Sequence, residues 1–311
     1  MQMYGNHGRI TVVLREAKAF YMIVTKWILI PLLMLISRLP FFILYGISNA
    51  LYLIGYKVIG YRKKVVRENL DSCFPNKTKQ ERLLIEKKFY RHLFDIIVES
   101  IKGFTISETE LKKRYVLLEN PEIDRLYEEK RKIMGVMTHK GNWEWAIVSG
   151  PLILKTRTFG VYKKLSNASM ESFMRIKRGR FGSIPIPMEK IYFTLREAKD
   201  RPLIAAFISD QNPASPKNAY WTTFLGKETA FMPGYAVIAK KLDMAVISTK
   251  VKKVKRGYYE VKAVIVTENA KELDKDDIMK QTCNIMEEDI LEHPEQWLWS
   301  HRRWKHKKPT A

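Results

Sequence analysis

The chain has 311 residues, of which 46% are hydrophobic and 28% are charged, and its 55 Lys and Arg residues outnumber 33 Asp and Glu residues to give a formal net charge of +22. This composition excludes a disordered or collagen-like chain and is sufficient for a buried core. The two cysteines, Cys73 and Cys283, lie far apart, so neither a disulfide scaffold nor a cysteine-based zinc site is expected. The positive charge favours a polyanionic partner, which could be nucleic acid, an anionic membrane surface or an acidic carrier protein.

Two apolar runs, residues 19–37 and 41–56, occupy the first part of the chain. Each comes close to the roughly 20 apolar residues that a spanning helix needs, although a lysine and a proline interrupt the first. The basic cluster at 57–67 would bind anionic head groups and favours a cytoplasmic location for the domain that follows. We therefore predict that residues 1–66 form an apolar helical membrane anchor, which either spans the bilayer or lies in its interface. Two buried helices of a soluble core are the alternative.

The body of the chain, residues 67–311, alternates between helix and strand patterns. A capping box at Thr78 and Glu81 begins an amphipathic helix that extends to about Gly103. Short apolar or alternating runs predict strands at 133–137, 158–162, 184–187, 203–209, 245–249 and 258–266, and helical patterns follow at 143–154, 165–180, 189–200, 232–242 and 276–292. This alternation indicates the α/β fold class, with a mostly parallel central sheet flanked by helices. The domain ends in a basic, Trp-rich tail of the kind found at membrane interfaces or stacked on single-stranded nucleic acid.

The segment after the strand at 133–137 carries the strongest candidate for catalysis. His139 lies at the carboxyl end of that strand, where ligands gather in open α/β sheets. Gly141 allows an unusual backbone angle and Asn142 can cap the next helix, so that Glu144 falls in its first turn and faces back toward His139. A carboxylate that orients a histidine makes a general-base pair. Because the segment has no Ser or Cys nucleophile, the proton would come from a substrate hydroxyl; a strand-end histidine without a catalytic role is the alternative.

The sequence THKGNWEW around His139 resembles the H-x4-D/E block of the bacterial lysophospholipid acyltransferase superfamily, in the form seen in lipid A biosynthesis (late) acyltransferases. Four further stretches are similar to that family and occur in its order: RENLDSCFPNKT, ISDQNP, FLGKETAFMPGYAVIAKKLDMAVI and PEQWLWSHRRWK. The resemblance covers about residues 30–306. It implies a glycerolipid acyltransferase-like fold and transfer of a fatty acyl group from an acyl carrier protein or CoA thioester to a hydroxyl of a membrane glycolipid or lysophospholipid. In such enzymes the histidine deprotonates the acceptor and the acidic residue orients it, which assigns these roles to His139 and Glu144.

Several further residues could serve this reaction. The backbone amides of Gly141 and Asn142 face the start of a helix and are candidates to stabilise the oxyanion. The basic segment 174–182 matches, by resemblance, the family's second block, in which an arginine contacts phosphate. Arg178 is our choice for that arginine and Arg175 is the alternative. A solvated basic helix face would also explain the segment.

Asp210 and Gln211 follow the strand at 203–209. Because the carboxyl ends of parallel strands meet at one edge of a sheet, this position should open onto the same crevice as His139. By resemblance the two residues belong to the family's third block and shape the acceptor or donor site. They could equally begin an Asx-turn before Asn212.

The leading hypothesis is a membrane-associated O-acyltransferase that acts on a lipid A precursor at the cytoplasmic side of a bacterial inner membrane. Its donor would be an acyl carrier protein or CoA thioester, and no cofactor or metal ion is expected. Acylation of a lysophospholipid or another glycolipid is the nearer alternative. A basic nucleic-acid-binding protein would explain the net charge but not the apolar N-terminus, and the chain has no nucleic-acid-binding motif. We therefore predict no nucleic-acid partner.

Overall fold

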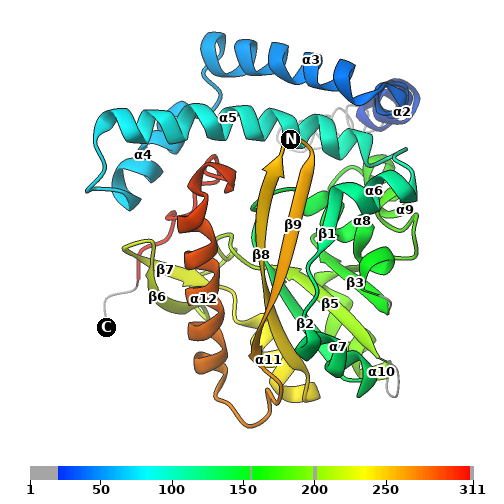
Figure 1. The fold of residues 1–311 in the computed structure, drawn as a ribbon, viewed down its shortest axis with the longest axis vertical. Helices are drawn as coiled ribbons and strands as arrows, with labels where there is room; N and C mark the ends of the chain where they lie inside the picture. Colours follow the sequence, from blue (N-terminus) through cyan, green and yellow to red (C-terminus); the bar gives the residue numbers. More distant parts are fainter. Residues whose placement is uncertain (1–19, 155, 199–201, 309–311) are drawn as a thin grey trace, which may run out of the picture.

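The computed structural model describes residues 20–154, 156–198 and 202–308. The first 19 residues of the predicted anchor, the end of the helix expected at 189–200 and the last three residues of the tail lie outside this part. The described chain forms a seven-stranded sheet flanked by helices, with a layer of apolar helices across one end (Figure 1). The predicted α/β fold class is therefore confirmed.

The sheet is mixed but mostly parallel. Its strand order is β1-β9-β8-β2-β5-β3-β4, and β8–β9 is the antiparallel pair, formed by a hairpin. The strands are β1 (Tyr115–Leu117), β2 (Lys132–Met137), β3 (Arg157–Tyr162), β4 (Ile184–Pro187), β5 (Leu203–Ile208), β8 (Ala245–Lys255) and β9 (Tyr258–Thr267). The sequence patterns located all of these except the three-residue β1. They also missed a separate hairpin of β6 (Tyr220–Phe224) and β7 (Lys227–Phe231).

The helices of the body bury apolar side chains against the sheet or against one another. The capping box at Thr78 and Glu81 is confirmed at the start of α5. The helices of the body are α4 (Lys63–Cys73), α5 (Lys79–Lys102), α6 (Glu108–Arg114), α7 (Pro121–Glu128), α8 (Trp143–Ile153), α9 (Ala168–Arg178), α10 (Ile191–Glu197), α11 (Gly234–Leu242) and α12 (Lys275–Glu292). Trp297 and Trp299 of the tail are buried in the core. The expectation that the Trp-rich tail lies at a membrane interface or stacks on nucleic acid is therefore wrong for these two.

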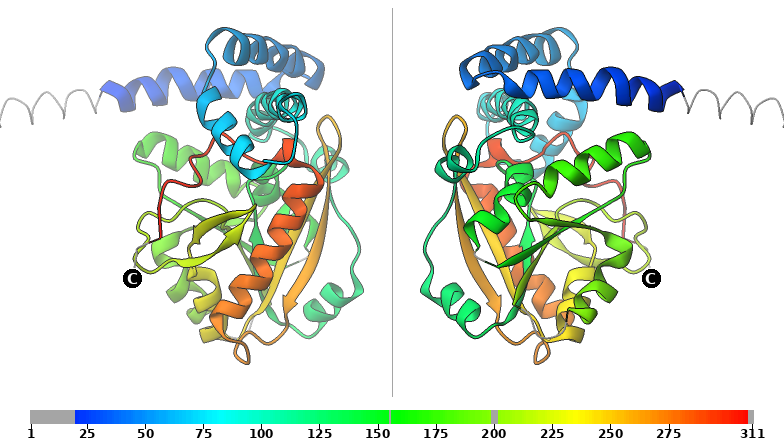
Figure 2. Two further views of the ribbon diagram at one scale, coloured as in Figure 1. Left: turned by 90° about the vertical axis from the view of Figure 1, so that its left-hand side faces the viewer. Right: turned by 90° about the vertical axis from the view of Figure 1, so that its right-hand side faces the viewer.

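Two apolar helices form a layer on the side of α5 that faces away from the sheet (Figures 1 and 2). The first contains α2 (Ile30–Arg38) and the second contains α3 (Phe41–Tyr52), and Pro40 breaks the chain between them because the residue before a proline is extended. The continuous helices Phe20–Arg38 and Phe41–Val58 are long and apolar enough to cross a membrane, judged by length and composition only. Just 11% and 22% of their residues are buried. Their most exposed apolar side chains include Phe20, Trp27, Ile28, Leu35, Phe42 and Val58.

Candidate active site

His139 and Asp210 lie side by side at the edge of the sheet that faces α5. The register of the parallel strands pairs Met137 of β2 with Ile208 of β5, so the residue two positions beyond each strand falls at the same place. Nδ1 of His139 is 2.6 Å from Oδ1 of Asp210, and the backbone N–H of His139 donates to Oδ2 at 2.8 Å. The carboxylate therefore holds both the ring and the backbone of the histidine.

Asp210 is itself held in one orientation. Its side chain is 2% exposed, and Oδ2 accepts a second hydrogen bond from Nε1 of Trp297 at 2.7 Å. Burial alone would raise the pKa of Asp210, but His139 and the donated hydrogen bonds outweigh burial and keep this pKa below its ordinary value. Asp210 is thus an ionised carboxylate whose Oδ1 accepts from one donor and whose Oδ2 accepts from two.

The second ring nitrogen of His139 is not hydrogen-bonded to Asp210. With the Nδ1 proton directed to Asp210, Nε2 carries the lone pair and accepts from Nε2 of Gln211 at 3.2 Å. Trp143 packs edge-on against the imidazole, with the ring centroids 5.3 Å apart, and 17% of the histidine side chain is exposed. This is the tautomer that a general base requires.

Glu144 contacts Arg178 rather than the imidazole. Its Oε1 accepts from Nη2 of Arg178 at 2.6 Å and its Oε2 accepts from Nε at 3.0 Å. Burial disfavours the charge on Arg178, but Glu144 outweighs that effect and raises the pKa of the guanidinium. The direct His139–Glu144 contact expected from the sequence is replaced by His139–Asp210, because the strand register delivers Asp210 to the ring while the two parallel donors of Arg178 engage both oxygens of Glu144.

The turn between His139 and α8 has the predicted backbone. Gly141 has a φ of +63°, and a Cβ at this position would lie 2.5 Å from Cγ1 of Val251. Asn142 caps α8, since its Oδ1 accepts from the N–H of Trp145 at 3.0 Å. However, the amide of Gly141 donates to the carbonyl of Gln296 at 3.1 Å, so the expectation that it faces an oxyanion is corrected.

A buried ion pair supports this turn and was not predicted from the sequence. Nζ of Lys140 donates to Oδ1 of Asp289 at 2.6 Å, and both side chains are almost completely buried. The N–H of Val251 donates to the same oxygen at 3.1 Å. The only hint in the sequence was a lysine directly after the candidate base. Its partner Asp289 lies on α12, far along the chain, so the sequence does not reveal the pair.

The remaining candidates are placed as follows. Gln211 joins His139 as described, and Arg178 joins Glu144. The side chain of Arg175 is exposed, one turn before Arg178 on α9. The structure therefore joins His139 to Asp210 and Gln211, and Glu144 to Arg178. Arg175 belongs to neither group.

The fold and the site define an α/β protein in which a buried carboxylate orients a histidine at the carboxyl edge of the sheet, the arrangement of a general base. The sequence profile of the family described as bacterial lipid A biosynthesis acyltransferase matches residues 15–306. The chain therefore belongs to this family and is an O-acyltransferase.

Individual relatives agree over most of the chain at low identity. The chain is 22% identical over 282 residues to the lipid A biosynthesis palmitoleoyltransferase of Escherichia coli (strain K12) and to the lipid A biosynthesis acyltransferase of Shigella flexneri. It is 20% identical over 280 residues to the lipid A biosynthesis lauroyltransferase of Escherichia coli (strain K12). Each alignment covers 90% of this chain and 90% of the relative.

Proposed function

We propose that this protein transfers a fatty acyl group from an acyl carrier protein or CoA thioester to a hydroxyl of a lipid A precursor at the cytoplasmic face of the bacterial inner membrane. Family membership and the names of the relatives support the reaction class and the acceptor. The observation that supports the mechanism is the His139–Asp210 pair, in which Asp210 engages Nδ1 and leaves the lone pair on Nε2, on a histidine side chain that is 17% exposed.

His139 acts as the general base in this proposal. Nε2 takes the proton of the acceptor hydroxyl while the oxygen attacks the thioester carbonyl, forming a C–O bond and a tetrahedral oxyanion. The oxyanion then collapses, the C–S bond breaks, and the imidazolium returns its proton to the departing thiolate. Asp210 stabilises the imidazolium between these two steps, as an ionised partner of a histidine does in other acyl-transfer enzymes.

The Glu144–Arg178 pair serves substrate placement in this proposal. Glu144 holds the guanidinium in one orientation, and a guanidinium binds phosphate with well-defined geometry. Arg178 would therefore contact a phosphate of the acceptor or donor, with Arg175 as the alternative contact. The backbone amide of Asn142, at the positive end of the α8 dipole, is the proposed oxyanion donor.

The apolar helices at Phe20–Arg38 and Phe41–Val58 would hold the enzyme at the membrane. Their large exposed apolar surface needs a nonpolar environment, and both helices lie in one layer, which suits insertion into the interface (Figure 2). The net charge of +22 supports contact with anionic lipid and with an acidic carrier protein.

Purified enzyme with labelled acyl donor and a choice of acceptors tests the function. We expect transfer to a lipid A precursor, and loss of transfer in His139→Ala with an unchanged melting temperature. Mass spectrometry of lipids from cells with and without the protein identifies the acceptor in vivo. Acylation of a lysophospholipid instead would support the alternative acceptor, and near-normal turnover by His139→Ala would remove this residue from the mechanism.

A further inference from the structure

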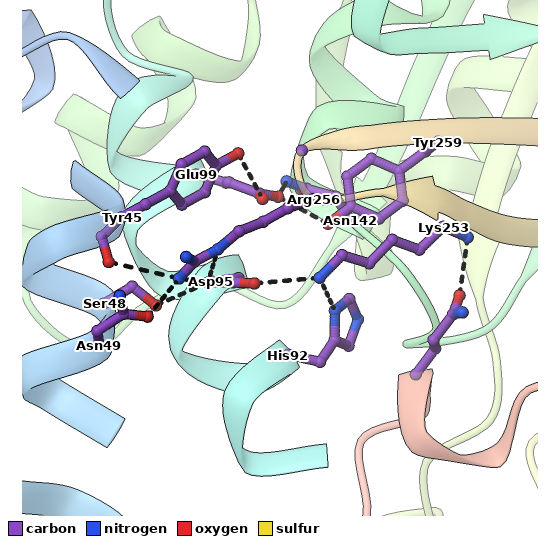
Figure 3. A network of polar contacts seen from close by, with 12 residues as sticks. Tyr45, Ser48, Asn49, His92, Asp95, Glu99, Asn142, Lys253, Arg256 and Tyr259 are labelled. Carbon is purple, nitrogen blue, oxygen red and sulfur yellow. Dashed lines mark hydrogen bonds and ion pairs between the residues drawn. The ribbon is translucent and has the colours of Figure 1, made fainter. Parts of the chain in front are cut away.

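Two carboxylates on successive turns of α5 connect the apolar layer to the rest of the protein (Figure 3). Asp95 accepts hydrogen bonds from Ser48 of α3 at 2.7 Å and from Lys253 of β8 at 3.1 Å. Arg256, in the β8–β9 turn, donates to it as well, at 2.6 Å and 2.9 Å. Asp95 is therefore a carboxylate with two cationic partners. Its role is to bind α3 to the β8–β9 hairpin.

Glu99 is different, because its hydrogen-bond donors are all neutral. Its residue is 0% exposed. Oε1 accepts from the hydroxyl of Tyr45 on α3 at 3.1 Å, and Oε2 accepts from the hydroxyl of Tyr259 at 2.7 Å and from Nδ2 of Asn142 at 2.9 Å (Figure 3). A buried carboxylate without a bonded cation is energetically expensive, so packing alone does not account for an acidic residue here.

The link to Asn142 places Glu99 directly behind the candidate catalytic turn. Asn142 caps α8 with its Oδ1 and binds Glu99 with its Nδ2, three residues after His139 and two before Glu144. The backbone carbonyl of Glu99 also accepts from Nε1 of Trp145 at 2.8 Å. Glu99 thus holds the start of α8 at two points, one on each side of Glu144: Asn142 before it and Trp145 after it.

We propose that Glu99 is a positioning residue that couples the seating of α3 on α5 to the geometry of the catalytic turn, so that full turnover requires the Tyr45–Glu99 hydrogen bond. This proposal rests on the proposed function. α3 carries exposed apolar side chains and would contact lipid, while Tyr45 is the residue of α3 that reaches Glu99. A shift of α3 on contact with the membrane would therefore change the position of Asn142 through the carboxylate of Glu99.

The chemistry of the carboxylate explains how the coupling works. Burial raises the pKa of Glu99 to about 7, while Lys253 and the hydrogen bonds from Tyr259 and Asn142 lower it and Asp95 raises it. The titratable and charged groups around Glu99 include Tyr45 from α3, Asp95 from α5, Lys253 from β8 and Tyr259 from β9. Arg114 and Arg256 act in turn on Tyr45.

Loss of the Tyr45 hydroxyl removes the donor that stabilises Oε1, so the pKa of Glu99 rises further and the carboxyl takes up a proton. The protonated carboxyl needs an acceptor for its O–H, but the Tyr45 oxygen is gone and the side-chain nitrogen of Asn142 can only donate. The carboxyl then loses its fixed orientation, and its hydrogen bond from Nδ2 of Asn142 is weakened.

Tyr45→Phe in the full-length protein, reconstituted in vesicles that contain an anionic phospholipid, tests the coupling. Tyr56→Phe is a matched control, because the Tyr56 hydroxyl donates to Oε1 of Glu86 at 2.9 Å and also joins the apolar layer to α5, with no connection to Asn142. We expect Tyr45→Phe to lower kcat about tenfold or more at neutral pH, with little change in KM, and to move the acid limb of the pH–rate profile to higher pH. Tyr56→Phe should leave kcat and the profile unchanged, and both variants should melt at similar temperatures.

Glu99→Gln provides a second test, because glutamine can direct its oxygen to Tyr259 and Asn142 and its amide to the Tyr45 hydroxyl. It should retain most of the turnover, and its pH–rate profile should show no contribution from residue 99, because glutamine does not titrate. Equal activity of Tyr45→Phe, Tyr56→Phe and wild type, or equal losses without a shift of the pH profile, would overturn the coupling while leaving His139 in its role. An inactive wild-type enzyme in the presence of donor and lipid A precursor would instead overturn the proposed function.

Discussion

Replacing Asp210 with asparagine tests which carboxylate orients the candidate base. Oδ2 of Asp210 has two donors, the backbone N–H of His139 and Nε1 of Trp297, whereas Oδ1 has one, Nδ1 of His139. An asparagine would place its oxygen at the position of Oδ2, where it accepts from both donors, and its NH2 group at the position of Oδ1, next to Nδ1 of His139. The imidazole must then carry its proton on Nε2, which is the wrong tautomer for a base.

The expected loss is large. Positioned general-base catalysis contributes about 10²–10⁴ in rate, and a histidine held in the wrong tautomer by an Asp-to-Asn change loses about 10⁴ in a related catalytic arrangement. We therefore expect Asp210→Asn to lower kcat by at least about 10²-fold, equivalent to roughly 3 kcal/mol of transition-state stabilisation. Acyl transfer at saturating donor and acceptor, with melting temperature as the folding control, measures this.

Glu144→Gln is the comparison that makes the test decisive. The change weakens the bidentate contact with Arg178, so it should raise the KM for a phosphate-bearing substrate by about tenfold and affect kcat less. If Glu144→Gln instead abolished turnover and Asp210→Asn were nearly as active as wild type, the assignment of Asp210 as the orienting carboxylate would be refuted.

Two further predictions concern stability. Gly141→Ala places a Cβ 2.5 Å from Cγ1 of Val251 at a φ of +63°, so it should lower the free energy of unfolding by about 1–3 kcal/mol. Gly226→Ala is the control, because its φ is +74° but no residue of the described chain lies near its Cβ. It should lower the free energy of unfolding by less, as measured in the same denaturant titration. The pKa of Glu99 is about 7 in the folded protein and 4.5 as its reference value. Glu99 therefore binds its proton more tightly in the folded than in the unfolded protein. The stability that this proton contributes is present below about pH 4.5 and is lost as the pH rises through 7. Glu99→Gln should consequently gain stability relative to wild type across this window, by up to roughly 3 kcal/mol, and parallel pH profiles of unfolding would contradict this.

Local signals in the sequence located much of the fold and the histidine that is the candidate base. The alternation of apolar runs and helical patterns predicted the mostly parallel sheet, because each pattern reflects the geometry of a single element. His139, Gly141 and Asn142 were placed correctly around the end of β2 for the same reason: a strand end, a residue with positive φ and a helix cap are properties of adjacent residues. The three-residue β1 and the β6–β7 hairpin had no such pattern.

The partners of these residues were decided by tertiary structure. Both Glu144 and Asp210 were candidates near His139, and the pairing of Met137 with Ile208 across β2 and β5 selected Asp210. Which carboxylate meets a side chain depends on strand register and helix packing between segments far apart in the chain, and no local pattern encodes that register.

Glu99 illustrates the same limit from the other direction. In the sequence it is one of several glutamates on an amphipathic helix, where a solvent-exposed position would be the ordinary expectation. Its burial results from α3, β9 and the catalytic turn converging on one side of α5. The sequence alone thus determined most of the elements and the position of the candidate base, whereas the contacts that orient this histidine arise only when distant segments are brought together by folding.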